Sequence, residues 1–426
     1  MRPPATLAIF TCLVLGAAAS CSDKDAQESA GGAAGNASAG GGAAGNASSG
    51  GKSQAGSSAL VAGAGGERAP VGGSGGGVDP MLGDAGVGQL VGGLGGVDGV
   101  GGVEGVAGIG GSAGEAAQLP GHAGTICDPS ASYGSPLPAP ANRTATRLSE
   151  GYFFTEGPVW VASGGYLLFS DFYNVGVAPY VPGAHIRRFT PPNTFDTFIT
   201  DSDSNGLALS GDGLTLFAAR RIKANVNDGE IASYLISTKA KTTLLDSPAG
   251  PNDLAARSDG NLYFSDGDVY RIDPSQAVAK AVQVSGQGAN GVMLSPDERT
   301  LYTGWSDGKV YASALAADGA AGAATPFASL EESGHPDGMT VDCAGNLYAA
   351  DYTNGIIQVF DNAGQYLGKI ALPAAAAPPI AAHATNVAFG GANHRTLFIT
   401  AHRGEWNDPA IGELHSIDLN VPGMPY

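Results

Sequence analysis

The sequence predicts an all-β protein, a six-bladed β-propeller that follows a long glycine-rich segment. Of its 426 residues, 68 are glycine, and about half of these lie between Cys21 and Gln118, a stretch without aromatic residues. The remaining part repeats itself at a period of about 40 to 50 residues, which is typical of propeller blades. Each repeat holds short β-branched and aromatic runs separated by glycine-containing turns, the pattern of β-hairpins.

The first 21 residues resemble an export signal. Met1-Arg2 is a short positive start, and the apolar run Ala5 to Ala19 is too short to span a bilayer. The run ends in Ala18-Ala19-Ser20-Cys21, which resembles a bacterial lipobox, although an ordinary small-residue cleavage site is the alternative. We therefore expect an exported protein, periplasmic or anchored to the outer membrane as a lipoprotein through Cys21.

Residues 22–118 are predicted to be a disordered tether. They are mostly Gly, Ala and Ser, and such a composition cannot bury enough apolar surface to offset the entropy of ordering. Residues 119–426 are then the folded domain, long enough for one substantial core. The formal net charge of −18 argues against nucleic acid or an anionic membrane surface as partner, so only the anchor would contact a membrane.

Six copies of the repeat follow one another with starting points 49, 47, 38, 47 and 48 residues apart. In each copy a short apolar strand, a turn such as Ser258-Asp-Gly-Asn261, a second strand and a third strand after a glycine can be recognised. A weaker fourth strand completes the predicted blade. The copies begin at Glu156-Gly-Pro-Val-Trp, Asn205-Gly-Leu-Ala-Leu, Asn252-Asp-Leu-Ala-Ala, Asn290-Gly-Val-Met-Leu, Asp337-Gly-Met-Thr-Val and Thr385-Asn-Val-Ala-Phe.

The last copy contains only three predicted strands, the third of which ends near Leu419, and it has no segment for a fourth strand. The segment Ala145-Thr-Arg-Leu-Ser149, which precedes the first copy, is predicted to supply the missing outer strand and so to close the ring. A closed ring leaves few open sheet edges.

The first residues of the six copies are expected to form one polar ring, because the first strand of each propeller blade lines the central channel. An oxygen-rich ring of this kind suits a hard divalent cation such as Ca²⁺. The alternative is that Asn-Gly and Asp-Gly simply form turns, but that does not account for Glu156. The ring consists of Glu156, Asn205, Asn252, Asn290, Asp337 and Thr385.

Six motifs occur in order along the folded part of the chain. They are Glu156-Gly-Pro-Val-Trp160, Pro251-Asn-Asp-Leu254, Asn290-Gly-Val-Met-Leu-Ser-Pro-Asp297, Pro336-Asp-Gly-Met339, Thr385-Asn-Val-Ala-Phe-Gly-Gly391 and Ile417-Asp-Leu-Asn-Val-Pro-Gly423. Together they resemble the SMP-30/gluconolactonase family, the lactonases related to senescence marker protein-30 and regucalcin. The resemblance covers about residues 125 to 426 and implies a six-bladed propeller with one catalytic divalent metal ion, commonly Ca²⁺ or Zn²⁺, that hydrolyses sugar lactones.

Carried over by position, the resemblance implies Glu156, Asn290 and Asp337 as metal ligands. In a metal-dependent hydrolysis we expect Asp337, with Glu156 as the alternative, to be the catalytic base that takes a proton from the attacking water. Asn252 matches a substrate-contacting position and Asn205 a further channel-lining position that orients substrate. The sequence departs from the family pattern at two places, and both affect the expected substrate contacts rather than the metal ligands. Gly250 stands where some members carry a substrate-contacting arginine, and Ala218-Ala-Arg-Arg221 replaces a Glu-His-Gly segment.

We therefore expect a monomeric, metal-dependent sugar lactonase whose partner is a small lactone. The alternatives are a non-catalytic propeller that serves as a binding scaffold, and a metal-dependent esterase acting on a non-sugar lactone or a phosphotriester.

Several other residue types are open to two interpretations. His335 is expected to be either an auxiliary acid or base beside Asp337, or a solvated loop residue without a catalytic role. His402 and Arg403 could likewise lie near the channel mouth or be residues without a role in the site. An exported compartment permits a disulfide between Cys127 and Cys343, but two unpaired thiols are equally compatible with the sequence.

Overall fold

The structure is a computed structural model that describes residues 123–171, 184–221, 229–247, 250–374, 381–404 and 411–425. The predicted signal peptide, Cys21, the tether 22–118 and the domain start at residue 119 lie outside these residues. No helix in the described ranges is long and apolar enough to cross a membrane.

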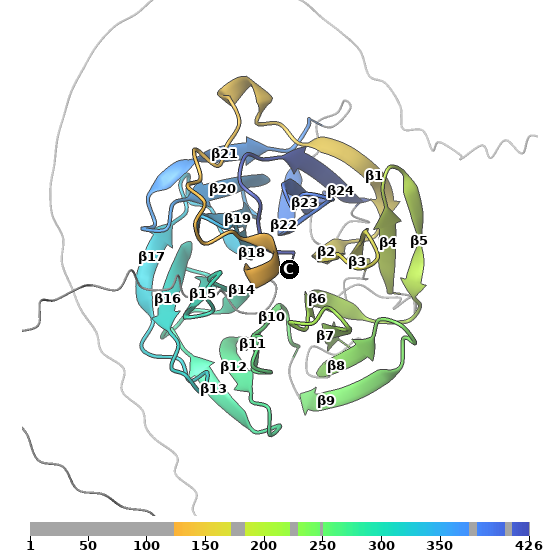
Figure 1. The fold of residues 1–426 in the computed structure, drawn as a ribbon, viewed down its shortest axis with the longest axis vertical. Helices are drawn as coiled ribbons and strands as arrows, with labels where there is room; N and C mark the ends of the chain where they lie inside the picture. The colour runs from red at the N-terminus through yellow and green to blue at the C-terminus, as the bar shows by residue number, and fades with distance from the viewer. Residues whose placement is uncertain are drawn as a thin grey trace, which may run out of the picture. The chain divides into compact units, whose positions relative to one another are not determined.

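The described chain forms six four-stranded antiparallel sheets arranged around one axis, which confirms the six-bladed propeller (Figure 1). The first three blades are built as follows. Blade 1 contains β2 (Thr155–Val161), β3 (Tyr166–Asp171), β4 (His185–Thr190) and β5 (Thr194–Ile199). Blade 2 contains β6 (Ser204–Leu209), β7 (Thr215–Arg221), β8 (Gly229–Leu235) and β9 (Lys241–Ser247). Blade 3 contains β10 (Leu254–Ala256), β11 (Leu262–Asp266), β12 (Asp268–Ile272) and β13 (Val278–Val282).

The other three blades complete the ring, together with two short helices, α1 (Ala123–Ile126) and the 3-10 helix η1 (Pro140–Asn142). Blade 4 contains β14 (Ala289–Leu294), β15 (Thr300–Trp305), β16 (Lys309–Ala314) and β17 (Thr325–Ser329). Blade 5 contains β18 (Pro336–Val341), β19 (Leu347–Asp351), β20 (Ile356–Phe360) and β21 (Tyr366–Ala371). Blade 6 contains β22 (Ala382–Gly390), β23 (Thr396–Arg403), β24 (Ile411–Asp418) and β1 (Thr146–Tyr152).

Burial decreases from the axis outward in each blade. Every residue of the inner strands β2, β6 and β18 is buried, whereas the outer strand β13 is mostly exposed. The second half of each of these inner strands is mostly apolar, whereas its first half carries the buried polar residues. The hydrophobic core lies between neighbouring blades, where these inner strands pack against one another.

Aspartate side chains fix several of the hairpin turns that the sequence indicated. The Oδ1 atom of Asp342 accepts hydrogen bonds from the backbone N–H groups of Ala344 and Asn346, both at 2.9 Å. Asp361 accepts in the same way from Ala363 and Gln365. Such side-chain bonds replace backbone bonds that a tight turn cannot make, so these turns set the register of the strands on either side.

The ring is closed by β1, as the sequence predicted. β1 pairs antiparallel with β24, with Thr146 opposite Ser416. The closure is reinforced by the buried carboxylate of Glu413, which accepts from Arg147 Nη1 at 2.8 Å, from Arg403 Nε at 2.8 Å and contacts His415 Nε2 at 3.0 Å. Arg403 thus stabilises blade 6 rather than the channel mouth.

One end of the central channel is covered by the two ends of the described chain. Two inner strands donate backbone hydrogen bonds to the last described residues. Trp160 N donates to Pro425 O at 2.7 Å, and Phe389 N donates to Met424 O at 3.0 Å. Met424 N in turn donates to Val341 O at 2.9 Å. We call this end the closed face, and Figure 1 shows both the short helix α1 and the C-terminus near the centre of the ring.

A disulfide joins α1 to the same face. Cys127 and Cys343 are bonded, with 5.2 Å between their Cα atoms and 216 residues between them in sequence. The structure thus selects the disulfide over two free thiols. A bridge that closes so long a loop restricts the unfolded chain strongly.

Removal of this bridge in a Cys127→Ser, Cys343→Ser double variant is expected to lower the free energy of unfolding by about 2 to 4 kcal/mol. Urea unfolding of the oxidised protein and of the double variant measures the difference. An unchanged urea midpoint would show that the bridge does not constrain the unfolded chain as the loop length implies.

Candidate functional site

A pocket of about 330 Å³ lies at the opposite end of the channel from the closed face, where the inner strands begin. Most of its lining side chains are polar, and they come from blades 1 to 5. The lining residues are Phe154, Glu156, Asn205, Arg221, Asn252, Asn290, His335, Asp337 and Tyr352.

Five of the six residues predicted to form the ring line this pocket, and Thr385 does not. Thr385 lies at a shift of strand register between Ala384 and Asn386. Its Oγ1 donates to the backbone oxygen of Thr155 at 2.7 Å, so the side chain faces the neighbouring blade. The expectation for Thr385 was wrong because its short side chain is held by the Thr155 backbone oxygen and lies 2.9 Å from Thr400 Oγ1, contacts that the repeat spacing does not reveal.

Two further polar residues, Asp253 and Asn386, lie beneath the ring and were missed from the sequence. Asn386 Nδ2 donates to Glu156 Oε2 at 3.1 Å and to Asp253 Oδ1 at 3.4 Å, and Val292 N donates to Asp253 Oδ2 at 3.0 Å. Together they form a polar floor under the pocket.

The sequence feature that could have revealed this polar floor is the residue type at the second position of each repeat. Four copies have glycine there, whereas two have Asp253 and Asn386. A Cβ atom at Gly206 would lie 2.7 Å from Asp253 Oδ1, and one at Gly338 would lie 1.9 Å from Asn386 Cγ. The glycines therefore leave the space that the two longer side chains occupy.

Three buried carboxyl groups, those of Glu156, Asp253 and Asp337, lie close together. Burial, and next the charge of Asp253, raises the pKa of Glu156 to about 8. Burial raises the pKa of Asp253 to about 6. The pKa of Asp337 lies well above its usual range because of burial and the charges of the other two. In the absence of a compensating cation, ionisation of this cluster is costly.

The donor set fits a hard divalent cation. Asn290 Oδ1 is buried and has no hydrogen-bond partner among the described residues, and it lies in the pocket with Glu156 and Asp337. Carboxylate and amide oxygens are ligands typical of Ca²⁺. The described residues contain no group of three or more His, Cys, Asp or Glu that could hold a metal. The candidate site therefore depends on two carboxylates and one amide oxygen.

The two remaining asparagines form a pair on the side of blades 2 and 3. Asn205 Nδ2 donates to Asn252 Oδ1 at 2.9 Å, while Asn205 Oδ1 is buried without a hydrogen-bond partner among the described residues. This pair presents polar atoms to the pocket next to the carboxyl groups, as expected of groups that orient a ligand.

An aromatic wall adjoins the polar residues. Tyr352 lines the pocket, and its hydroxyl lies 3.0 Å from His402 Nε2, while His383 Nδ1 contacts the Tyr352 backbone oxygen at 2.8 Å. Burial lowers the pKa of His402 to about 3, so this ring is neutral. His402 therefore lies behind Tyr352. His335 lines the pocket directly, and burial lowers its pKa as well.

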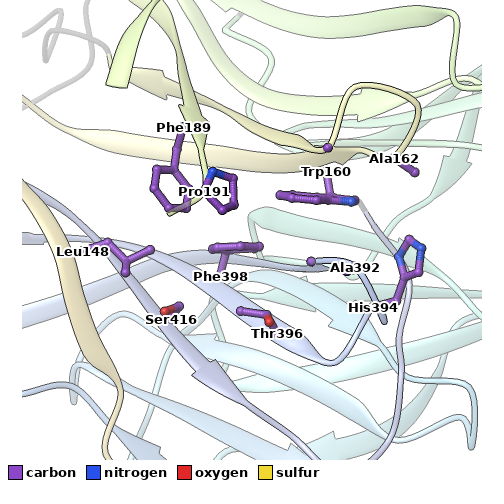
Figure 2. Close-up of a pocket in the computed structure, with 12 residues that line it drawn as sticks. Leu148, Trp160, Ala162, Phe189, Pro191, Ala392, His394, Thr396, Phe398 and Ser416 are labelled. Atoms are coloured by element: carbon purple, nitrogen blue, oxygen red, sulfur yellow. The ribbon is translucent and has the colours of Figure 1, made fainter. Parts of the chain in front are cut away.

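A larger cavity, of about 630 Å³, lies between blades 1 and 6 (Figure 2). Trp160 and Phe398 stack with ring centroids 5.6 Å apart, and Phe189 and Leu148 lie beside them. The described lining residues include no Asp or Glu. This cavity lacks the groups that a metal-dependent reaction needs, so the smaller polar pocket is the candidate active site.

Without metal ions, the protein is expected to lose stability as pH rises from about 4 to about 8. Glu156 and Asp253 have folded-state pKa values, about 8 and about 6, that exceed the usual unfolded values near 4. Between these limits the folded state binds more protons than the unfolded state, so stability falls with pH. Melting temperatures measured in chelator across this range test the expectation, and Asp253→Asn should flatten the curve. A melting temperature that rises steadily to pH 8 would contradict it.

Comparison with known proteins supports the assignment of the fold and of the family. The family model for the SMP-30/gluconolactonase/LRE-like region matches residues 154–403. Pentonolactonase XacC of Haloferax volcanii is 28% identical over 292 residues, covering 63% of this chain and 92% of that protein. A gluconolactonase of Zymomonas mobilis is 27% identical over 255 residues, covering 51% and 69%.

Among solved structures, the calcium-binding protein regucalcin from Agrobacterium tumefaciens superposes with a TM-score of 0.53 at 17% identity, covering 66% of this chain and 95% of that one. This likeness supports the propeller fold. Since the family model spans more than half of the sequence and includes all five ring residues that line the pocket, the chain belongs to the SMP-30/gluconolactonase family.

Proposed function

We propose that this protein hydrolyses sugar lactones with the help of one divalent cation, Ca²⁺ in the first place and Zn²⁺ as the next candidate. The observation that carries the proposal is the buried oxygen cluster in which Asn290 Oδ1, beside Glu156 and Asp337, has no hydrogen-bond partner in the part of the chain that the structure describes. The names of the two lactonase relatives support the substrate class. The calcium-binding neighbour supports the choice of ion.

Glu156, Asn290 and Asp337 would hold the cation, which would act as a Lewis acid on the lactone carbonyl. Lactone hydrolysis adds the oxygen of water to the carbonyl carbon and breaks the bond to the ring oxygen, which ends as a hydroxyl group. Asp337 would take the proton from the attacking water and pass it to the ring oxygen. A neighbouring cation would keep Asp337 ionised, which this role as a base requires.

The other lining residues position the substrate. The Asn205–Asn252 pair offers hydrogen bonds to the substrate's hydroxyl groups. Tyr352 and Phe154 give the pocket an apolar side, and such a surface excludes water from the reacting atoms. Burial lowers the pKa of His335, so at neutral pH its ring lines the pocket near Asp337 without adding a positive charge.

The test is lactone turnover after metal removal and replacement. The purified protein is treated with chelator, and hydrolysis of glucono-δ-lactone and of a pentonolactone is followed with Ca²⁺, Zn²⁺ or Mn²⁺ added back. We expect turnover to fall at least about tenfold on chelation and to return with one of these ions. Full turnover in chelator would overturn the metal dependence. A metal-dependent melting shift without lactone turnover would favour a binding scaffold or another ester as substrate.

We also propose that the protein is exported and carries a lipid on Cys21, on the strength of the sequence pattern that ends there. Incorporation of labelled palmitate in bacterial cells, and its loss in Cys21→Ser, would support the anchor. Equal labelling of the two forms would exclude Cys21 as the lipid-bearing residue.

A further inference from the structure

Arg221 is the one lysine or arginine among the described lining residues of the pocket. It is the last residue of β7, and its backbone is fixed on both sides, since Arg221 N donates to Asp203 O at 2.9 Å and Arg221 pairs with Gly229 of β8. The carboxylates of Glu156 and Asp337 are close enough to act on its charge. The side chain therefore enters the site already described.

The neighbouring Arg220 shows what an arginine with a structural role looks like in this blade. Arg220 is buried and forms an ion pair with Glu230 on β8. Successive side chains of a strand point to opposite faces. Arg221 accordingly points away from that pair, and its Nε atom is buried without a hydrogen-bond partner among the described residues. A buried donor that is left unpaired is costly, which indicates that a ligand completes it.

Asn205 leaves an acceptor unpaired in the same pocket. Its Oδ1 atom is buried without a hydrogen-bond partner among the described residues. The two residues lie on neighbouring strands, because β6 and β7 pair with Ser204 opposite Arg220. As far as the described residues show, blade 2 thus contributes an unpaired donor, Arg221 Nε, and an unpaired acceptor, Asn205 Oδ1, to the pocket.

A hydroxyl group is both a donor and an acceptor, so it can pair with both atoms at once. A carboxylate can accept from Arg221 but cannot donate to Asn205 Oδ1, and an unsubstituted lactone carbon can do neither. We propose that Arg221 acts with Asn205 to bind a ring hydroxyl group of the substrate and so selects polyhydroxylated lactones over unsubstituted ones. This inference rests on the proposed lactonase function and names the residue that sets its substrate class.

The test compares two lactones of the same ring size, glucono-δ-lactone and δ-valerolactone, which has no hydroxyl groups. Values of kcat and KM are measured for the full-length protein, for Arg221→Met, which keeps the length of the side chain but removes its donors, and for Arg221→Lys, which keeps the charge. The control is Arg188→Met, because Arg188 lies on β4 in an exposed pair with Asp196. Melting temperatures establish that each variant is folded.

We expect Arg221→Met to lower kcat/KM for gluconolactone at least about tenfold, mainly through KM, and to leave δ-valerolactone within about twofold. Arg221→Lys should keep only part of the preference for gluconolactone over δ-valerolactone, since lysine keeps the positive charge but lacks the guanidinium group and its Nε donor. Arg188→Met should change neither substrate.

Two outcomes would overturn the proposal. An equal fall for both lactones would show that Arg221 acts as a counter-charge to the carboxylates, and unchanged gluconolactone kinetics would show that it does not bind substrate. If the unaltered protein hydrolyses neither lactone in the presence of metal ions, the lactonase function itself fails, and the assignment of Arg221 fails with it.

Discussion

Asp337→Asn is expected to lower lactone hydrolysis at least about 100-fold, the scale on which loss of one group that stabilises charge in a transition state is felt. The substitution keeps the shape of a buried side chain, 6% exposed, but removes its charge and its capacity to accept a proton. It should also abolish the rise in melting temperature that a saturating divalent ion gives the unaltered protein.

The same variant should become more stable when no metal is present. Burial and the charges of Glu156 and Asp253 raise the pKa of Asp337 well above its usual range, so the folded state disfavours an ionised carboxyl group at this position and a neutral amide avoids that cost. Melting in chelator at pH 8 measures this effect. The matched control is Asp418→Asn, at the exposed end of β24 far from the pocket. If Asp337→Asn kept full turnover, the base and the metal ligand would have to be sought elsewhere.

Deletion of β1 is expected to prevent cooperative folding. Without β1, the edge of β24 is unpaired, and the buried Glu413 loses the hydrogen bond from Arg147. Burial opposes ionisation of Glu413, but hydrogen bonds from His415, Arg403 and Arg147 outweigh it and hold its pKa at about 2. Removing one partner of such a buried charged group is costly.

Two chains that both lack Cys127 separate the strand from the disulfide. One begins at residue 143 and keeps β1, and the other begins at residue 153 and lacks it. Near-ultraviolet circular dichroism and urea unfolding should show a cooperative transition for the first only. Identical transitions in both would mean that three strands suffice in blade 6.

The blades, their order and the closing strand could be predicted from the sequence because each rests on a local pattern that is repeated. The position of Glu156 relative to Asn290 and Asp337 also follows from that register. Thr385 could not be placed correctly, since its hydroxyl group donates to the backbone oxygen of Thr155 in the neighbouring blade, a contact that the repeat does not encode.

Other parts of the site depend on contacts between distant segments. The polar floor of Asp253 and Asn386 forms only because glycines at the second position of neighbouring repeats leave room for the two side chains, and that packing becomes apparent only in the folded ring. The approach of Arg221 to Glu156 joins residues of two blades. The pairing of Cys127 with Cys343 depends on a distance across the closed face that no sequence pattern encodes.

The closed face also determines how the molecule can be attached to something else. Cys127 is bonded to Cys343, whose backbone N–H donates to Pro422 O at 2.8 Å, so both ends of the described chain meet at the face opposite the pocket. A fusion partner or a solid support joined directly before residue 123 or after residue 425 would therefore be attached at the closed face, opposite the described pocket. Protein immobilised in this way should keep the KM of the protein in solution.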